Sequence, residues 1–448
     1  MNKTGKVTLS LVEVISLGVG TMIGAGIFAL FGQISTLAGG YAWAAFIVSG
    51  IVSALAGYAY YDLSKISNTN GGVAEYLTRG WNGGLIGSAI SFCYYLSIAI
   101  VLGLVAESFG HYSAKVLSLG SGWVDYFAIG VMLAFLLINA TGIKLMGVAE
   151  KILVIAKLVV LVGFTVLMFT HFDPATYAAN DSAVSFGFGN FVNAVALANL
   201  SFAGFAVIAN AGGSVENKAV IAKAIFIAIL LVGAVYVALD VAVFGAIDLS
   251  KIESAKDYAL AAAARPDLGT TGFLIIGITA MVSTMTNINA NIFSGSSTIG
   301  FMARHNEVSP VLAKPLFLRQ GNIAMVATVC IVIGMILLLD LSQIGDVASA
   351  TFLLVHTFVP LGAALRSQEG KGGRLALLWL ATLANGALLA FFLWHLIGKH
   401  DLEIYVFAGI VVFALLFTGI SRTLLGDVEI EPAGDDPGQA GGTVSARG

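Results

Sequence analysis

The chain carries its apolar residues in long continuous runs that are separated by short polar segments. A helix needs roughly 20 mostly apolar residues to cross the hydrocarbon core of a bilayer, so the runs predict about twelve membrane-spanning helices. We place these spans at 10–37, 41–64, 84–110, 123–141, 147–169, 188–212, 220–246, 270–303, 322–340, 343–365, 374–397 and 402–424. Strands of a transmembrane barrel would alternate apolar and polar residues. The pattern therefore predicts an all-α membrane protein.

Composition supports this assignment. Of the 448 residues, 58% are hydrophobic and only 10% are charged, whereas soluble domains carry about 25% charged residues. A net charge of −3 provides no basic surface for nucleic acid. Cys93 and Cys330 both lie in apolar runs, which argues against a disulfide framework or a metal cluster. We expect the lipid bilayer as surroundings, with no nucleic acid, no cofactor and no obligatory protein partner.

The distribution of basic residues predicts the orientation. Sixteen of the 22 Lys and Arg residues fall on the side of both termini, five fall on the other side, and Lys157 lies inside a span. Basic loops face the cytoplasm, so both termini are predicted to be cytoplasmic in a multi-pass protein of the cell inner (plasma) membrane. Residues 1–9 form the predicted cytoplasmic N-terminus. Residues 427–448 contain many Gly and two Pro, which predicts a disordered cytoplasmic tail.

Two spans are rich in small residues. The first contains GVGTMIGAGIF at 18–28, with Gly18, Gly20, Gly24 and Gly26. The sixth contains SFAGF at 201–205. Each glycine in a helix interior costs about 1 kcal/mol relative to alanine, so both segments can unwind readily. Small residues also permit close helix packing. Unwound backbone at membrane depth is tolerated only where it is buried in protein or lines a cavity.

The positions of these two spans favour a functional interpretation. If 10–170 and 188–366 are two inverted halves of five spans, the glycine-rich spans are the first of each half, and the spans in 374–424 lie outside the repeat. Such a pair indicates an inverted-repeat transporter with a central site. Amide groups at the start of a half-helix bind a carboxylate, and carbonyl groups at a half-helix end bind a cation. A zwitterion would satisfy both.

Four segments resemble the amino acid–polyamine–organocation (APC) superfamily: GTMIGAGIF at 20–28, VAEKILVIAKLVVL at 148–161, SFAGFAVIANAGGSVEN at 201–217 and GFMARHNEVSP at 300–310. The similarity covers roughly 10–425 and is closest to the prokaryotic ApcT-type proton-coupled amino acid transporters. The resemblance implies a LeuT-like five-plus-five inverted repeat with broken helices 1 and 6 and two extra C-terminal helices. It also implies secondary active transport of amino acids by alternating access, with the helix-prone loop at 250–266 as an external lid.

The resemblance assigns substrate-binding roles to both interrupted spans. The implied substrate-binding residues are Ile23, Gly24, Ala25, Gly26, Ser201, Phe202, Ala203, Gly204 and Phe205. The resemblance makes Phe205 a wall of the side-chain pocket and Phe202 or a neighbouring aromatic residue a gate. Where many relatives have Ser or Thr between the glycines of the first span, this chain has Ala25, which leaves binding to backbone amides. Neither interruption contains an acidic residue. Small or neutral amino acids are therefore expected ahead of cationic amino acids or polyamines.

Lys157 lies ten residues inside its span. A charged lysine at mid-helix costs about 2.5–3.5 kcal/mol on insertion scales, so the residue is either a structural tie between helices or a functional group. By the resemblance, its ammonium takes the place of a sodium ion and contacts Gly20, Ser283 and Thr286. The coupling ion would then be a proton. Proton-independent exchange, uniport and sodium coupling remain alternatives.

Several polar residues are left undecided by the sequence. Asp240 and His356 lie within spans and either titrate or form packing contacts, and Tyr94 and Tyr95 either line the pocket or pack. Charged residues near 62–79 form either an inner gate or solvated pairs. A channel, a membrane enzyme and a nucleotide-driven pump are disfavoured, because the sequence shows no charged ring, no HExxH or GxSxG motif and no GxxxxGK[ST] motif.

Overall fold

The computed structural model describes residues 9–65, 71–141, 148–211, 215, 217, 219–316, 321–366, 372–399, 402–426 and 428. Apart from Leu9 and Val428, the predicted terminal segments 1–9 and 427–448 lie outside the described residues. Within the described part the chain forms helices and no strand, with one isolated bridge between Pro315 and Asn322. This confirms the all-α prediction.

Each predicted span contains helix. In chain order the structure has α1 (Leu11–Met22), a π-helical segment (Ile23–Ile27), α2 (Phe28–Ala38), α3 (Ala42–Ser64), α4 (Gly72–Gly80), α5 (Leu85–Val116), α6 (Val124–Thr141), α7 (Val148–Thr170), α8 (Pro174–Ala183), α9 (Phe188–Phe202), α10 (Phe205–Asn210), α11 (Ala219–Ala246), α12 (Leu249–Ser254), α13 (Ala259–Arg304), α14 (Ile323–Leu338), α15 (Leu341–Arg366), α16 (Gly372–Lys399) and α17 (Leu402–Leu425). Ten helical stretches of the described residues are long and apolar enough to cross a membrane, and α1 and α14 are shorter apolar helices. The protein is a multi-span membrane protein.

Local sequence explains where several helices begin. Ser10 caps α1 by accepting from the backbone of Glu13, whose carboxylate in turn accepts from the Ser10 amide, which makes a capping box. Asn322 caps α14 through the Met325 amide. Asp173 caps α8 and accepts from Ala175 and Thr176, and these hydrogen bonds lower the pKa of its carboxyl.

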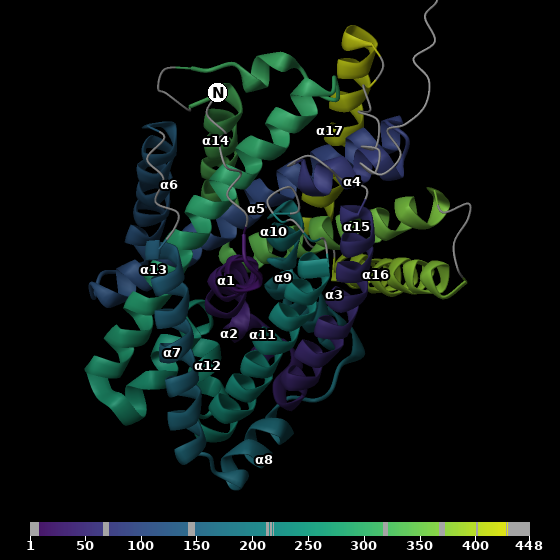
Figure 1. The fold of residues 1–448 in the computed structure, drawn as a ribbon. Coiled ribbons are helices and arrows are strands. Elements are labelled where there is room, and N and C mark those ends of the chain that lie inside the picture. The colour runs from purple at the N-terminus through teal and green to yellow at the C-terminus, as the bar shows by residue number, and fades with distance from the viewer. Residues whose placement is uncertain are drawn as a thin grey trace, which may run out of the picture.

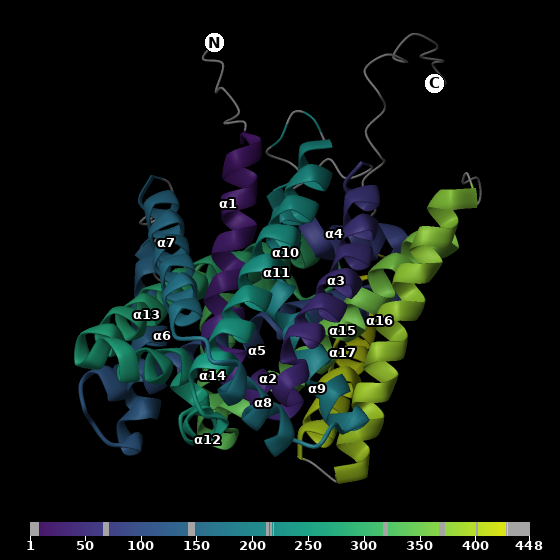
Figure 2. The same cartoon turned by 90° about the horizontal axis from the view of Figure 1, so that it is seen from below.

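The helices surround a central group formed by α1, α2 and α10. In both views α6 and α7 lie on one side of this group and α16 lies on the other (Figures 1 and 2). Figure 2 shows the start of α1 at one end of the bundle and α8 and α12 at the opposite end. The predicted spans likewise place the loops that contain α8 and α12 on the side of the membrane opposite to the N-terminus. The division into halves at 10–170 and 188–366 stays a prediction.

The loop at 250–266, which the resemblance makes an external lid, is helical as expected. It comprises α12, a 3₁₀ turn at Lys256–Tyr258 and the start of α13. It packs directly on α2, because a Cβ at Gly32 would lie 2.2 Å from the Lys256 carbonyl oxygen. Gly269, with φ +59°, separates this lid from the long remainder of α13.

Candidate functional site

The first span changes its helical register at the glycine-rich segment. Between α1 and α2, residues Ile23–Ile27 form a π-helix with helical dihedral angles at both ends. The segment is interrupted at the predicted place, but by a change from i→i+4 to i→i+5 bonding and not by an extended unwound stretch. Such π segments free backbone groups and occur frequently at functional sites.

Three successive carbonyl groups before the π segment accept from side chains of other helices. Lys157 Nζ of α7 donates to the Gly20 oxygen at 2.5 Å. Asn287 Nδ2 of α13 donates to the Thr21 oxygen at 2.9 Å, and Tyr236 Oη of α11 donates to the Met22 oxygen at 2.8 Å. All three donors come from distant parts of the sequence. The end of α1 is therefore tied to three neighbouring helices.

The sixth span is interrupted by two residues. α9 ends at Phe202, and Ala203 and Gly204 form a turn before α10 begins. The turn is satisfied locally, because the amides of Ala203, Ala206 and Val207 bond to carbonyls three residues earlier at 3.0–3.1 Å. Here too the interruption lies where the sequence predicts it and is short.

The two interruptions cross each other at very close range. A Cβ at Gly26 would lie 2.6 Å from Ser201 Cβ, and a Cβ at Gly204 would lie 2.7 Å from the Met22 amide nitrogen. A Cβ at Gly24 would lie 2.9 Å from Asn287 Cβ. The glycines are thus required by close packing, which confirms the packing interpretation of the glycine-rich spans, and their role in a binding site stays a prediction.

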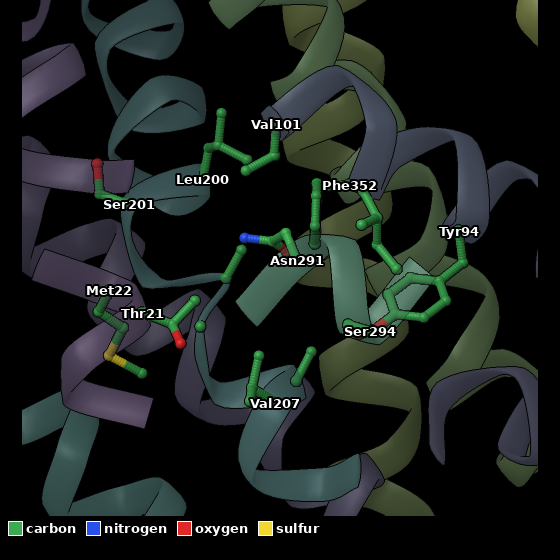
Figure 3. A pocket seen from close by; sticks show the side chains of 14 residues that line it. Thr21, Met22, Tyr94, Val101, Leu200, Ser201, Val207, Asn291, Ser294 and Phe352 are labelled. Atoms are coloured by element: carbon green, nitrogen blue, oxygen red, sulfur yellow. The ribbon is translucent and has the colours of Figure 1, made fainter. Parts of the chain in front are cut away.

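A small pocket of about 30 Å³ lies next to this crossing, room for about two water molecules. Figure 3 shows Thr21, Met22 and Ser201 on one side of it and Tyr94, Ser294 and Phe352 on the other. The full lining is Thr21, Met22, Tyr94, Ile98, Val101, Leu200, Ser201, Ala203, Gly204, Ala206, Val207, Asn291, Ser294 and Phe352. All of these residues are uncharged.

The predicted substrate residues separate into two groups. Ser201, Ala203 and Gly204 line the pocket, whereas Ile23, Gly24 and Gly26 are buried in the crossing beside it. The side chain of Ala25 lies outside the described part of the structure.

The two aromatic residues of the predicted site, Phe202 and Phe205, pack against other aromatic side chains. Phe202 is fully buried, and its ring centroid lies 5.6 Å from that of Tyr236. Phe205 packs between Tyr60 and His356 at centroid distances of 5.2 and 5.0 Å. Neither belongs to the lining of the pocket, so their roles as a gate and a pocket wall stay predictions.

Sequence reasoning did not assign Asn291, Ser294 and Phe352 to the site. Asn291 carries a signal that could have found it, since Asn287 and Asn291 are four residues apart on one face of α13. Asn291 Nδ2 donates to Asn287 Oδ1 at 2.6 Å, and Asn287 donates onward to the Thr21 oxygen. This relay joins the pocket to the end of α1.

Lys157 is 3% exposed and lies against α1. Its contact with Gly20 is present as the resemblance implies, and Val154 of the same helix lies within 2.8 Å of a Cβ placed on Gly20. On α13, Thr286 Oγ1 donates to the Ser283 oxygen at 2.8 Å, and the buried Ser283 hydroxyl has no hydrogen-bond partner among the described residues. The proton-coupling role of these residues stays a prediction.

The undecided polar residues are placed as follows. Tyr94 lines the pocket, whereas Tyr95 pairs with Thr328 at 2.6 Å. Asp240 is buried and accepts from Ser35 at 3.0 Å. His356 is fully buried among aromatic rings.

Comparisons with known proteins identify the family. The amino acid permease family profile matches residues 9–419. The chain is 30% identical to the inner membrane transport protein YbaT of Escherichia coli over 93% of this chain and 97% of that protein. It is 29% identical to an uncharacterized protein of Methanocaldococcus jannaschii over 92% and 96%. It is also 23% identical to the serine/threonine exchanger SteT of Bacillus subtilis, over 83% and 86% of the two chains.

These relationships decide the class of protein. The match covers nearly the whole chain, and the two relatives with a named function, YbaT and SteT, are transport proteins and not enzymes. The described helices supply the membrane-spanning framework that such a protein needs. The chain therefore belongs to the amino acid permease family of the APC superfamily, and its function is the transport of amino acids.

Proposed function

We propose that the protein moves small neutral amino acids together with protons by alternating access in the plasma membrane, with both termini in the cytoplasm. The observation that supports the coupling most directly is the bond from buried Lys157 to the Gly20 carbonyl at the end of α1. It connects an ionisable group to the interrupted span that borders the pocket.

The lining of the pocket supports the substrate class. A cationic or anionic side chain would find no opposite charge among the lining residues, and an unpaired buried charge is strongly unfavourable. Because the pocket has room for only about two waters, neighbouring side chains must move before any amino acid can bind. A small amino acid requires the smallest movement. Similarity to a serine/threonine exchanger agrees with small substrates.

The coupling follows from the charge of Lys157. A protonated ammonium gains a charge-assisted hydrogen bond to the Gly20 oxygen, whereas the neutral amine makes a weaker one. Protonation thus favours conformations in which α7 and α1 stay together, and loss of the proton favours conformations in which they separate. A ligand shifts a conformational equilibrium only through such a difference in interaction.

Transport in proteoliposomes tests this role. We expect Lys157→Ala to abolish the stimulation of uptake by external acid in sodium-free medium, because no group is left to carry the proton to the end of α1. Lys251→Ala, which removes an exposed lysine in α12, is the matched control and should behave as wild type. Size-exclusion chromatography establishes that both variants fold. Unchanged acid stimulation in Lys157→Ala would exclude the proposed coupling.

Exchange is the second candidate, because SteT is an exchanger. Counterflow of labelled serine measured without any ion gradient, followed by net uptake driven only by a pH gradient, separates the two. Strong counterflow with no net uptake favours exchange, whereas net uptake driven by the pH gradient favours proton symport. Stimulation by sodium at constant pH would indicate sodium coupling instead.

A further inference from the structure

The short helix α4 is buried although it carries charged residues. All of Gly72–Gly80 is buried, and Glu75 and Arg79 form an ion pair within the helix at 2.8 Å. Tyr76 Oη donates to the Ala209 oxygen of α10 at 3.0 Å, and Arg366 of α15 donates to the Arg79 oxygen at 3.0 Å. Helix α4 thus holds α10, which is the second half of the interrupted sixth span.

Glu307 approaches α4 from the segment that follows α13. Its side chain has no exposed surface, and it contacts the Thr78 hydroxyl through Oε1. Its second oxygen, Oε2, has no hydrogen-bond partner among the described residues. Val308 and Ala74 are in the same apolar cluster. A carboxylate with one unpaired oxygen is costly in such surroundings, whereas a neutral carboxylic acid is tolerated far better.

The number of available protons points to the neutral form. The Thr78 hydroxyl has one proton and lies within hydrogen-bond distance of two acceptors, the Ala74 oxygen at 2.9 Å and Glu307 Oε1. While Glu307 is ionised, Thr78 is the donor to both oxygens and must share its one proton, whereas a protonated Glu307 can donate to Thr78 Oγ1 and leave the Thr78 proton to the Ala74 oxygen. The Ala74 oxygen also accepts from Ser91 of α5 at 3.3 Å, which extends the network to a second helix.

Charged groups around Glu307 are already engaged elsewhere. Arg422 of α17 donates to the Gly83 oxygen, and Arg79 of α4 pairs with Glu75. On its own segment, His305 Nδ1 contacts the Phe301 oxygen at 2.9 Å, and Arg304 is exposed. Burial raises the pKa of Glu307 to about 7, although Thr78 and Arg422 both act to lower it. The group therefore titrates in the physiological range.

We propose that Glu307 is a cytoplasmic proton sensor, which in its protonated form ties α4 to the segment after α13, in the position where Tyr76 of α4 contacts α10, and so keeps the cytoplasmic side of the transporter closed. The cytoplasmic location follows from the proposed orientation, and the effect on transport rests on amino acid transport and not on Lys157. In an open conformation water reaches the carboxyl and its pKa returns toward its ordinary value. The closed form is then favoured at acidic cytoplasmic pH and loses that advantage as pH rises toward 7. Acidification of the cytoplasm by proton-coupled uptake would slow further uptake.

Hydrogen–deuterium exchange measures the contact without any transport. We expect the protection of residues 72–80 in nanodiscs, corrected for intrinsic exchange, to fall about tenfold between pH 6 and pH 8, as one carboxyl with a pKa of about 7 in the closed form predicts. Glu307→Gln keeps the shape and has an amide that can donate to Thr78, so its protection should stay high at both pH values. Protection that is independent of pH in wild type would overturn the proposal.

Transport then tests the consequence. At fixed external pH, we expect wild-type serine exchange to slow severalfold when internal pH falls from 8 to 6, and Glu307→Gln to be slow at both. Glu403→Gln removes a buried carboxyl near the start of α17 and is the matched control, with the wild-type response. A normal internal pH response in Glu307→Gln would overturn the sensor even if Lys157→Ala behaves as proposed above.

Thr78 provides a second, independent variant. Thr78→Val removes the hydroxyl that Glu307 contacts, so residues 72–80 should lose protection already at pH 6. Thr78→Ser keeps the hydroxyl and should restore both the protection and its pH dependence. If Thr78→Val retains the wild-type pH dependence of exchange, Glu307 does not act through α4.

Discussion

The two interrupted spans satisfy their backbone groups in different ways. In the first span, the carbonyls of Gly20, Thr21 and Met22 accept from side chains of α7, α13 and α11. In the sixth span, the turn at Ala203 and Gly204 is closed by bonds between residues three apart in sequence. The first interruption depends on its neighbours, and the second is self-contained.

This difference suggests a division of labour. Any movement of the end of α1 must break or carry along bonds to three other helices, so this region suits the transmission of a charge change such as that at Lys157. The turn of the sixth span contributes Ser201, Ala203 and Gly204 to the pocket, and its backbone hydrogen bonds among the described residues are local, so its movement breaks fewer hydrogen bonds to distant helices. Under the proposed function, we therefore expect coupling to depend mainly on the first span and substrate contact mainly on the sixth.

The largest effect should come from filling the crossing of the two spans. In Gly26→Val the new Cβ would lie 2.6 Å from Ser201 Cβ and 2.8 Å from Ser201 Cα, and backbone atoms cannot move aside cheaply. We expect a loss of about 3 kcal/mol of stability, seen as a large drop in melting temperature and folded yield. Gly163→Val, where nothing lies within 4 Å, is the control and should be nearly neutral. Equal stability of the two variants would mean that the crossing is loose.

Removal of one long-range donor should have an intermediate effect. Asn287→Ala removes the side-chain amide that donates to the Thr21 oxygen and accepts from Asn291, which keeps only its bond to the Asn287 backbone oxygen, at a cost of about 2 kcal/mol. Because the relay joins pocket and α1, we also expect a reduced pH dependence of uptake. Asn289→Ala, two residues away and bonded to Asn139 instead, should leave that dependence intact. If both variants respond alike, the relay does not carry coupling.

The smallest effect on stability is expected in the self-contained turn. Ser201 Oγ donates to the Leu197 oxygen of its own helix at 3.3 Å, so Ser201→Ala should cost about 0.5 kcal/mol or less. Since Ser201 lines the pocket, KM for a small amino acid should change while the melting temperature does not. Loss of stability similar to that of Asn287→Ala would contradict the contrast between the two spans.

The sequence predicted the helical framework well, because spans of apolar residues report burial in lipid directly. Predicted and observed spans agree within a few residues at most ends; for example 41–64 was predicted where α3 covers Ala42–Ser64. The predicted 270–303 lacks the start of α13 at Ala259, since the lid segment before Gly269 is too polar to resemble a span. A segment that mixes polar and apolar residues, as 259–268 does, is not recognised as helix by a search for long apolar runs.

The site was predicted in part. Glycine positions located both interruptions, and the family resemblance supplied the contact of Lys157 with α1. The pocket residues Phe352 and Ser294 could not be predicted, because the sequence does not show whether an aromatic or hydroxyl residue in a span faces the pocket, another helix or lipid. The buried role of Glu307 was equally hidden, since a charged residue in a loop is ordinarily solvated.

The small size of the central pocket bears on how well the membrane potential is maintained. A transporter that waits for its cargo with a wide water-filled passage would let ions flow down the membrane potential and dissipate it. Space for about two waters between α1, α9 and α15 is too short for a continuous file of solvent. A molecule in this conformation therefore offers ions no continuous water path through this pocket.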